Sequence, residues 1–255
     1  MTFIDTHTHL YSEEFKDDRT GMIDLAITKG VNKFYLPNID SSSINGMLEL
    51  ELQYPDHCFP MMGLHPCSVK ENYQEELAVV KQWLDTRRFL AIGEIGLDLY
   101  WDKTFIKEQE IAFRQQIEWA LHYNYTIDIH CRNAFDEIYA ILKSYSKLPK
   151  GVFHCFSGTI EQAEQVLAFG NFKLGIGGVV TFKNSGLDKV VEHIDIKHLI
   201  LETDAPYLAP MPYRGKRNES GYIPLIAEKI AILKGTTVDT VAKATTQNAL
   251  DIFEN

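Results

Sequence analysis

Short apolar runs alternate along the chain with longer segments whose apolar residues recur at helical spacing. Near-continuous apolar runs followed by helices are typical of a parallel sheet that is buried on both faces. Ile23 and Ile27 mark one helical face that we extend to Val31, and a second runs from Ile111 towards Tyr125. The pattern predicts eight strands: Phe3–His7, Lys33–Pro37, Phe59–Gly63, Phe89–Gly93, Thr126–His130, Gly151–Cys155, Phe172–Ile176 and Leu199–Thr203.

Eight strand–helix units in 255 residues fit a closed α/β barrel, the (β/α)8 or TIM barrel, as one domain spanning residues 1–255. The alternative is a doubly wound open sheet. That fold usually carries a glycine-rich phosphate turn after its first strand, where this chain has histidines. From Tyr222 to Phe253 the pattern predicts two more helices, divided near Gly235.

Metal-binding residue types follow the predicted strands. His7 and His9 are two residues apart, so on a strand their imidazoles would point the same way. Such a pair alone is often only two polar side chains in contact with solvent. Other strand ends, however, carry Glu94, His130, His154 and Asp204, and in a barrel the carboxyl ends of the strands meet on one face, where active sites lie. We therefore predict a metal site there. Four of the five histidines outside this set are expected on loops and helix surfaces: His57, His122, His193 and His198.

Composition narrows the functional classes. The 35 acidic residues exceed the 25 basic ones by ten, which disfavours a protein that holds nucleic acid by a general basic surface. A local phosphate site remains compatible, because bound metals supply positive charge. The four cysteines lack paired spacing, Met1 leads directly into a predicted strand, and no apolar run is long enough to span a membrane. We expect a cytoplasmic protein without a membrane partner.

Six candidate ligands exceed what one catalytic metal usually needs, so we predict two divalent ions. Glu94 lies on a middle strand and is best placed to bridge them. We assign His7, His9, Glu94 and Asp204 to one ion and Glu94, His130 and His154 to the other. A water between two cations is acidified towards neutral pH, and Asp204 is the natural general base for it. Histidine-rich ligation favours transition ions, and the sequence does not distinguish zinc, manganese, nickel and magnesium.

Several short motifs run along the chain: Asp5-Thr6-His7-Thr8-His9-Leu10, Gly63-Leu64-His65-Pro66, Ile92 to Asp98, Ile129 to Ala134, Phe153 to Gly158, Leu201 to Leu208, Arg214 to Glu219 and Asn248-Ala249. They resemble the motifs of TatD-family metal-dependent deoxyribonucleases, in family order over nearly the whole chain. Cys131 stands where the family often has Ser or Thr, and Ser220 stands where it often has Pro. The resemblance implies a TIM-barrel hydrolase of the amidohydrolase-like group that cleaves DNA phosphodiester bonds with two divalent ions, held by the same six residues.

Two further polar residues stand beside this set. His65 follows the third strand and could contact the leaving group or a phosphate oxygen, or be a loop histidine held by Pro66. Asp98 either orients a ligand histidine or caps the segment that follows it.

Cationic residues near the strand ends are candidates for phosphate contacts. Arg132 and Lys183 each lie just past a strand, and the dense cluster Arg214-Gly215-Lys216-Arg217-Asn218 follows the last one. Such a run is often only a solvated face. Beside a metal centre we favour a phosphate-binding loop with Arg214, Arg217 and Asn218 as contacts, because arginine binds phosphate in a bidentate way.

Three aromatic residues follow Asp98 in the sequence. Tyr100, Trp101 and Phe105 could stack on an unpaired base, but aromatic residues beside a barrel mouth are often loop packing, which we favour here.

Three hypotheses for function remain. The leading one is an enzyme, a nuclease that trims DNA ends, with DNA bound transiently, no stable protein partner, and a monomer or small homo-oligomer as its state. The second is hydrolysis of a cyclic amide, a small phosphate ester or an aminoacyl ester by the same centre. The third is a binding protein with structural ions, which usually have closed four-ligand sites. The basic cluster favours a phosphate-bearing substrate.

Overall fold

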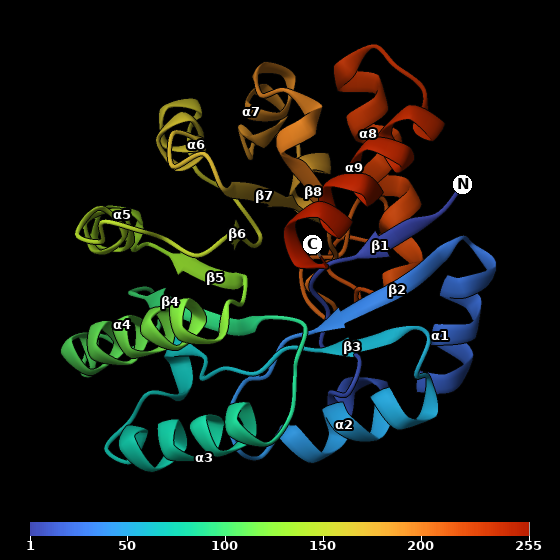
Figure 1. Ribbon diagram of the computed structural model, residues 1–255. Helices are drawn as coiled ribbons and strands as arrows, with labels where there is room; N and C mark the ends of the chain where they lie inside the picture. The colour runs from blue at the N-terminus through green and yellow to red at the C-terminus, as the bar shows by residue number, and fades with distance from the viewer. Residues whose placement is uncertain (255) are drawn as a thin grey trace.

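The computed structural model describes residues 1–254 and forms a (β/α)8 barrel with the strands inside and the helices outside (Figure 1). All strand pairs are parallel, in a sheet of order β1-β2-β3 and a sheet of order β4-β5-β6-β7-β8. The strands are β1 (Phe3–Asp5), β2 (Val31–Leu36), β3 (Cys58–Pro60), β4 (Ile92–Asp98), β5 (Ile127–Arg132), β6 (Gly151–Phe153), β7 (Phe172–Ile176) and β8 (Leu199–Leu201).

Backbone hydrogen bonds join the two sheets at both seams. Thr6 N donates to Leu201 O over 3.0 Å between β1 and β8. At the other seam, Leu90 N donates to Pro60 O over 2.9 Å and Met62 N donates to Ala91 O over 3.1 Å. The predicted barrel is therefore confirmed, and an open doubly wound sheet is excluded.

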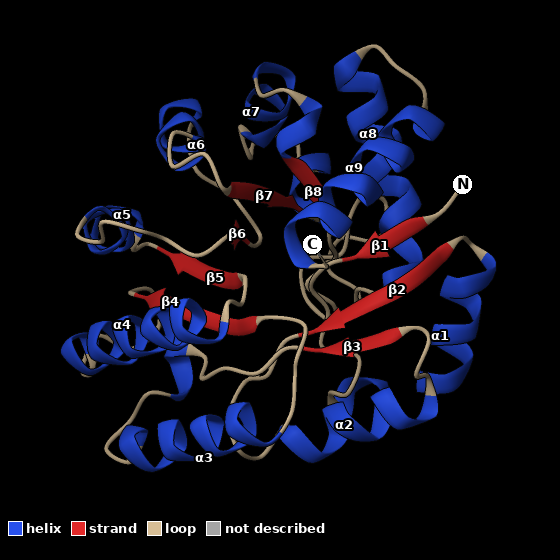
Figure 2. Ribbon diagram, in the orientation of Figure 1, coloured by secondary structure: helices blue, strands red, loops and turns tan. Residues whose placement is uncertain are grey.

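The helices surround the barrel (Figure 2). Their buried apolar residues join those of the strands in one core, as the helical spacing of the sequence predicts. They are α1 (Arg19–Thr28), α2 (Ile44–Gln53), α3 (Tyr73–Thr86), α4 (Ile106–Tyr123), α5 (Phe135–Lys143), α6 (Ile160–Leu167), α7 (Leu187–His193), α8 (Ile223–Lys234) and α9 (Val238–Phe253). None of the helices in residues 1–254 is long and apolar enough to cross a membrane.

Helix α9 closes the end of the barrel where the strands begin, and its last turn lies near the centre of Figure 1. Ile252 and Phe253 pack there with Ile4 and Tyr35 in a buried apolar cluster. The predicted division between the last two helices is confirmed, because Gly235 ends α8 with a φ of 60°. Because α9 covers this end, a functional site is expected at the opposite end of the barrel.

Two predicted element boundaries were wrong. Val31 does not continue the first helical face but begins β2, because Gly30 ends that segment with a φ of 89°. The fourth strand, predicted over Phe89–Gly93, instead runs from Ile92 to Asp98. Gly93 was the predicted end of the strand, but Gly93 and Gly96 both lie inside β4, where residues of β5 approach closely.

Candidate metal centre

The predicted ligands come from five strands, or from the residues directly after them, and the structure brings all of them together at the carboxyl end of the barrel. Most are buried; His130 and Asp204 are partly exposed. This convergence follows from parallel strands that end on one face. The six residues are His7 and His9 after β1, Glu94 in β4, His130 in β5, His154 after β6 and Asp204 after β8.

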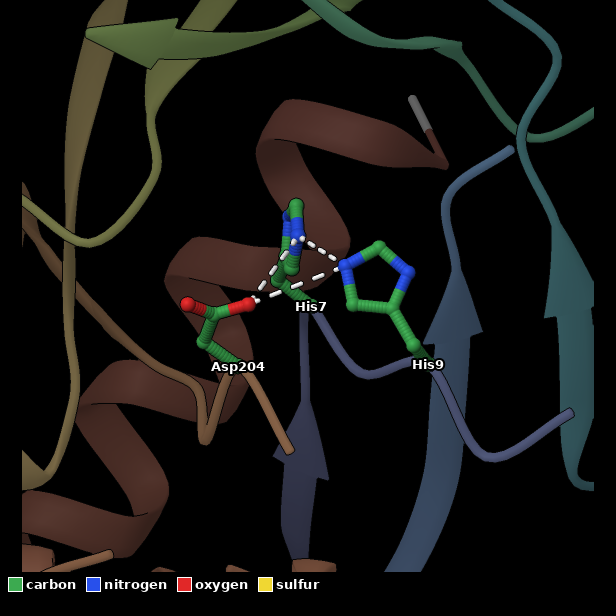
Figure 3. A group of neighbouring side chains, drawn as sticks. All are labelled: His7, His9 and Asp204. Atoms are coloured by element: carbon green, nitrogen blue, oxygen red, sulfur yellow. Dashed lines mark hydrogen bonds and ion pairs between the residues drawn. The ribbon is translucent and has the colours of Figure 1, made fainter. Parts of the chain in front are cut away.

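The first group comprises His7, His9 and Asp204 (Figure 3). The Nε2 atoms of the two histidines lie 3.3 Å apart. The Oδ1 atom of Asp204 lies 3.8 Å from Nε2 of His7 and 3.7 Å from Nε2 of His9. Three donor atoms thus face one small volume.

Glu94 connects this group to the other histidines. Its Oε1 atom lies 2.7 Å from both Nδ1 of His130 and Nε2 of His154. Its Oε2 atom lies 3.2 Å from Nε2 of His7 and 3.5 Å from Nε2 of His9. Each carboxylate oxygen therefore faces a different pair of imidazoles, which is the arrangement that a bridging ligand requires.

The donor set fits a pair of divalent cations. Ring nitrogen faces ring nitrogen between His7 and His9, and again between His130 and His154 at 3.2 Å. Two unprotonated nitrogens repel one another at such distances, whereas a cation accepts a lone pair from both. Imidazole and carboxylate donors in this mixture suit zinc, manganese, nickel and iron.

Electrostatics at the centre favour an ionised Glu94 carboxylate beside a protonated His7. Burial alone would lower the pKa of His7, but the carboxylates of Asp128 and Glu94 hold it well above its usual value. Burial alone would raise the pKa of Glu94, but His65, His154 and His7 hold it well below its usual value. A divalent cation would replace the histidine protons as the positive charge here.

Hydrogen bonds behind the histidines fix the orientation of three rings. Nδ1 of His7 lies 2.6 Å from Oδ2 of Asp128, and Nε2 of His130 lies 3.0 Å from Oδ2 of Asp98. The Tyr11 hydroxyl lies 2.8 Å from Nδ1 of His9 and donates to Pro37 O. Such contacts aim the opposite ring nitrogen at a metal.

The sequence analysis missed Asp128 and Tyr11. Strand alternation could have found them, because Asp128 lies two residues before His130 and Tyr11 two after His9. For Asp98 the predicted capping role is confirmed, since its Oδ1 accepts hydrogen bonds from Tyr100 N and Trp101 N. Its Oδ2 contacts His130, as orientation of that ring requires, and the ligand role of His130 stays a prediction.

Glu202 is another buried acid that the sequence analysis missed. It accepts a hydrogen bond from Cys155 N, and its Oε1 atom lies 3.9 Å from Nδ1 of His154. Burial raises its pKa well above the usual value, which favours the protonated form. Gly175 lies directly against this side chain. A residue with a Cβ at that position would collide with Glu202, so glycine leaves the room that the carboxyl group needs.

His65 lies inside the cluster and is not a remote loop residue. Its Nε2 atom lies 3.2 Å from Oε1 of Glu94, and its Nδ1 accepts a hydrogen bond from Cys67 N. With Glu94 and His130 it forms a further group of possible metal donors. Its predicted contact with substrate stays a prediction.

The predicted phosphate contacts divide into two sets. Arg132, Lys183 and Arg214 are exposed, and the Arg214 guanidinium lies 4.4 Å from the centre of the Phe182 ring, next to Lys183. They are available to a substrate.

Two of the predicted contacts are instead part of the scaffold. The Nη1 and Nη2 atoms of Arg217 donate to the two carboxylate oxygens of Asp18, over 2.8 and 2.6 Å. Asn218 is fully buried, and its amide donates to Thr203 O and Tyr207 O. Asn218 therefore cannot reach a substrate, and the expectation of a direct contact was wrong for it. Both residues hold the loop after β8.

The favoured packing role of the aromatic residues after Asp98 holds for only one of them. Phe105 is partly buried against the core. Tyr100 and Trp101 are 52% and 68% exposed, so loop packing was the wrong interpretation for these two.

Comparisons with known proteins agree with this geometry. A sequence model of the family described as TatD related DNase matches residues 4–254. The chain is 38% identical to the uncharacterized metal-dependent hydrolase YabD of Bacillus subtilis and 32% identical to the protein of Erwinia tasmaniensis named 3'-5' ssDNA/RNA exonuclease TatD, covering 98% of both chains in each case. The crystal structure of the TatD homologue YjjV from Escherichia coli superposes with a TM-score of 0.93 at 29% identity, over 99% of this chain and 98% of that one. The chain therefore belongs to the family of TatD-related DNases and is a metal-dependent hydrolase.

Proposed function

We propose that this protein is a nuclease that removes nucleotides from an end of single-stranded DNA by hydrolysing phosphodiester bonds with two divalent ions. One observation carries the proposal: the Glu94 carboxylate lies between two pairs of imidazoles, with one oxygen towards each pair. That arrangement suits two neighbouring cations, which serve phosphodiester hydrolysis by holding the attacking and leaving oxygens.

The ligands divide into two sets that share Glu94. His7, His9 and Asp204 with Glu94 would hold one ion, and His130 and His154 with Glu94 would hold the other. When bound, the ions would acidify a water and stabilise the negative charge that develops on the phosphate.

Asp204 is the candidate proton acceptor. Its side chain is 15% exposed, whereas that of Glu94 is 3% exposed, so Asp204 is the carboxylate of the pair that water reaches more easily. It can take the proton of the attacking water and release it to solvent.

Two observations support nucleic acid as the substrate. The relative from Erwinia tasmaniensis is named as an exonuclease of single-stranded DNA and RNA. In this chain, Arg132 is exposed at the end of β5, and Lys183 and Arg214 are exposed on the segments after β7 and β8. There they could contact substrate phosphates. These exposed cationic side chains near the strand ends favour a charged polymer over a neutral amide.

The test is a metal-restoration assay. The protein is stripped with a chelator, magnesium, manganese, zinc or nickel is restored, and end-labelled single-stranded and duplex DNA are digested. We expect stepwise shortening of the single strand with at least one metal, and loss of more than about 100-fold in rate for Glu94→Gln. The matched control is Glu164→Gln, an exposed glutamate that pairs with His193, which keeps full activity.

The nuclease proposal fails if no metal restores cleavage of any DNA, or if Glu94→Gln cleaves DNA like the unmodified protein. Cyclic amides and small phosphate esters are assayed in parallel, so that turnover of one of these alone would reassign the substrate of the same centre.

A further inference from the structure

Beside the metal centre lies an exposed group of two aromatic rings and one guanidinium. The rings of Tyr100 and Trp101 meet edge to face, with their centres 4.9 Å apart. The Arg132 guanidinium carbon lies 4.2 Å from the centre of the Tyr100 ring and 5.2 Å from that of Trp101. We propose that Tyr100, Trp101 and Arg132 form a stacking platform for one unpaired nucleobase of the substrate, a step that rests on the proposed function.

Exposure distinguishes the platform from ordinary packing. Trp101 is 68% exposed and Tyr100 is 52% exposed, although the backbone N–H groups of both residues donate to Asp98 of β4. Water contact with large aromatic rings is costly, at about 25 cal/mol per Å² of apolar surface. A stacked base would cover that surface.

The platform is fixed in position relative to a predicted metal ligand. One oxygen of Asp98 accepts from the backbone N–H groups of Tyr100 and Trp101, at 2.9 and 3.1 Å. The other oxygen lies 3.0 Å from Nε2 of His130. A single carboxylate therefore links the backbone of both aromatic residues to a predicted metal ligand, so the platform lies beside the metal centre.

Arg132 supplies the charge that selects a nucleotide over another planar ligand. It is the residue paired with Asp98 across β4 and β5. Within residues 1–254 no carboxylate oxygen lies within ion-pair distance of its guanidinium, and it stacks on the rings instead. Its N–H groups remain available to a phosphate oxygen, and stacked arginine combines well with base stacking.

The test measures binding without cleavage. Metal-loaded protein is titrated with a thymidine octamer whose phosphorothioate linkages resist hydrolysis, and with an abasic octamer of the same length and charge, following fluorescence anisotropy of a terminal dye. Stacking contributes about 1–3 kcal/mol per base, so we expect the thymidine octamer to bind roughly tenfold more tightly than the abasic one.

Variants assign that difference to the platform. Trp101→Ala should reduce the ratio to about one, Trp101→Phe should retain most of it, and Arg132→Ala should weaken both octamers alike. Leu52→Ala, which removes an exposed apolar side chain on α2, is the matched control and keeps the full ratio. An unchanged ratio in Trp101→Ala overturns the platform, even if the protein cleaves DNA. A ratio that depends on Trp101 in a protein that cleaves no DNA supports the platform and refutes the nuclease.

Discussion

At the scale of single residues, the carboxylates behind the histidines decide how well the imidazoles can serve as ligands. Asp128 bonds Nδ1 of His7 and Asp98 bonds Nε2 of His130. Each bond leaves the opposite nitrogen aimed at the centre and favours the tautomer with a lone pair there.

Asp128→Asn and Asp98→Asn should therefore each weaken metal binding by about 10–100-fold, because an amide orients the ring but does not stabilise it as an anion does. Isothermal titration calorimetry with zinc or manganese measures the loss. Asp239→Asn, which removes an exposed ion pair with Lys243 on α9, is the control and should leave affinity unchanged. Equal affinity of Asp128→Asn and the unmodified protein would contradict the orienting role.

A second residue-scale prediction concerns the buried thiol of Cys58, far from the metal ligands at the start of β3. Burial raises its pKa to about 12, whereas an exposed thiol titrates near 8.5. Between these values the folded chain keeps a proton that the unfolded chain has lost. The free energy of unfolding should therefore fall as pH rises, by up to about 1.4 kcal/mol per pH unit from this group.

Urea denaturation between pH 9.5 and 11 tests this dependence. Both Cys58→Ala and Cys58→Ser lack the titrating thiol, so each should show a shallower decline of the free energy of unfolding than the unmodified protein. Other groups that titrate in this range are common to all three chains. Parallel declines would show that the Cys58 thiol does not keep its proton in the fold.

At the scale of elements, the sequence predicted which residues meet at the strand ends more accurately than it predicted where each strand begins and ends. The apolar runs identified all eight strands, and the polar residues after them converge as expected. The fourth strand was predicted to end at Gly93, whereas β4 continues to Asp98 and needs Gly96 for its close contact with β5. The sequence pattern around a residue does not show which neighbouring strand lies against it in the barrel.

The same limit explains the mixed outcome for the loops. Charge alone did not separate Arg214, which is exposed, from Arg217, which pairs with Asp18 on the segment before α1. Those partners are about 200 positions apart in the chain, so only the closed barrel brings them together. Loop aromatics pose the same problem, since the exposure of Trp101 depends on which neighbours cover it.

Gly96→Ala tests the contact between β4 and β5. Gly96 has a φ of 140°, and a Cβ there would collide with the carbonyl oxygen of His130. Backbone strain of about 1–3 kcal/mol and a steric overlap of similar size should lower the free energy of unfolding by roughly 2–5 kcal/mol. Urea denaturation of the metal-free protein measures this loss.

Gly21→Ala is the matched control, because Gly21 lies in α1 and a Cβ there would meet no atom within 4 Å. Alanine should stabilise that helix by about 0.5–1 kcal/mol. Similar effects of the two substitutions would mean that β4 and β5 do not approach as closely as described.

At the scale of the whole molecule, the centre exists only once the barrel is closed. His7 and Asp204 come from opposite ends of the chain and meet across the seam between β1 and β8, where Asp204 N donates to His7 O over 2.9 Å. Glu94 comes from the far side of the other seam. A cation bound by all three therefore links both seams, so metal binding and barrel stability must be coupled.

Removal of metal should lower the thermal stability of the protein. Metal at about 1,000 times its dissociation constant adds about 4 kcal/mol per independent site, which corresponds to roughly 8–16 °C in Tm for a chain of this size. Differential scanning calorimetry of chelated and metal-restored protein measures the difference. In Glu94→Gln the shared ligand loses its charge, so restored metal should raise Tm by only a small fraction of that amount, while Glu164→Gln should respond fully. An equal rise of Tm in Glu94→Gln would show that the ions bind without the carboxylate that joins the two histidine pairs.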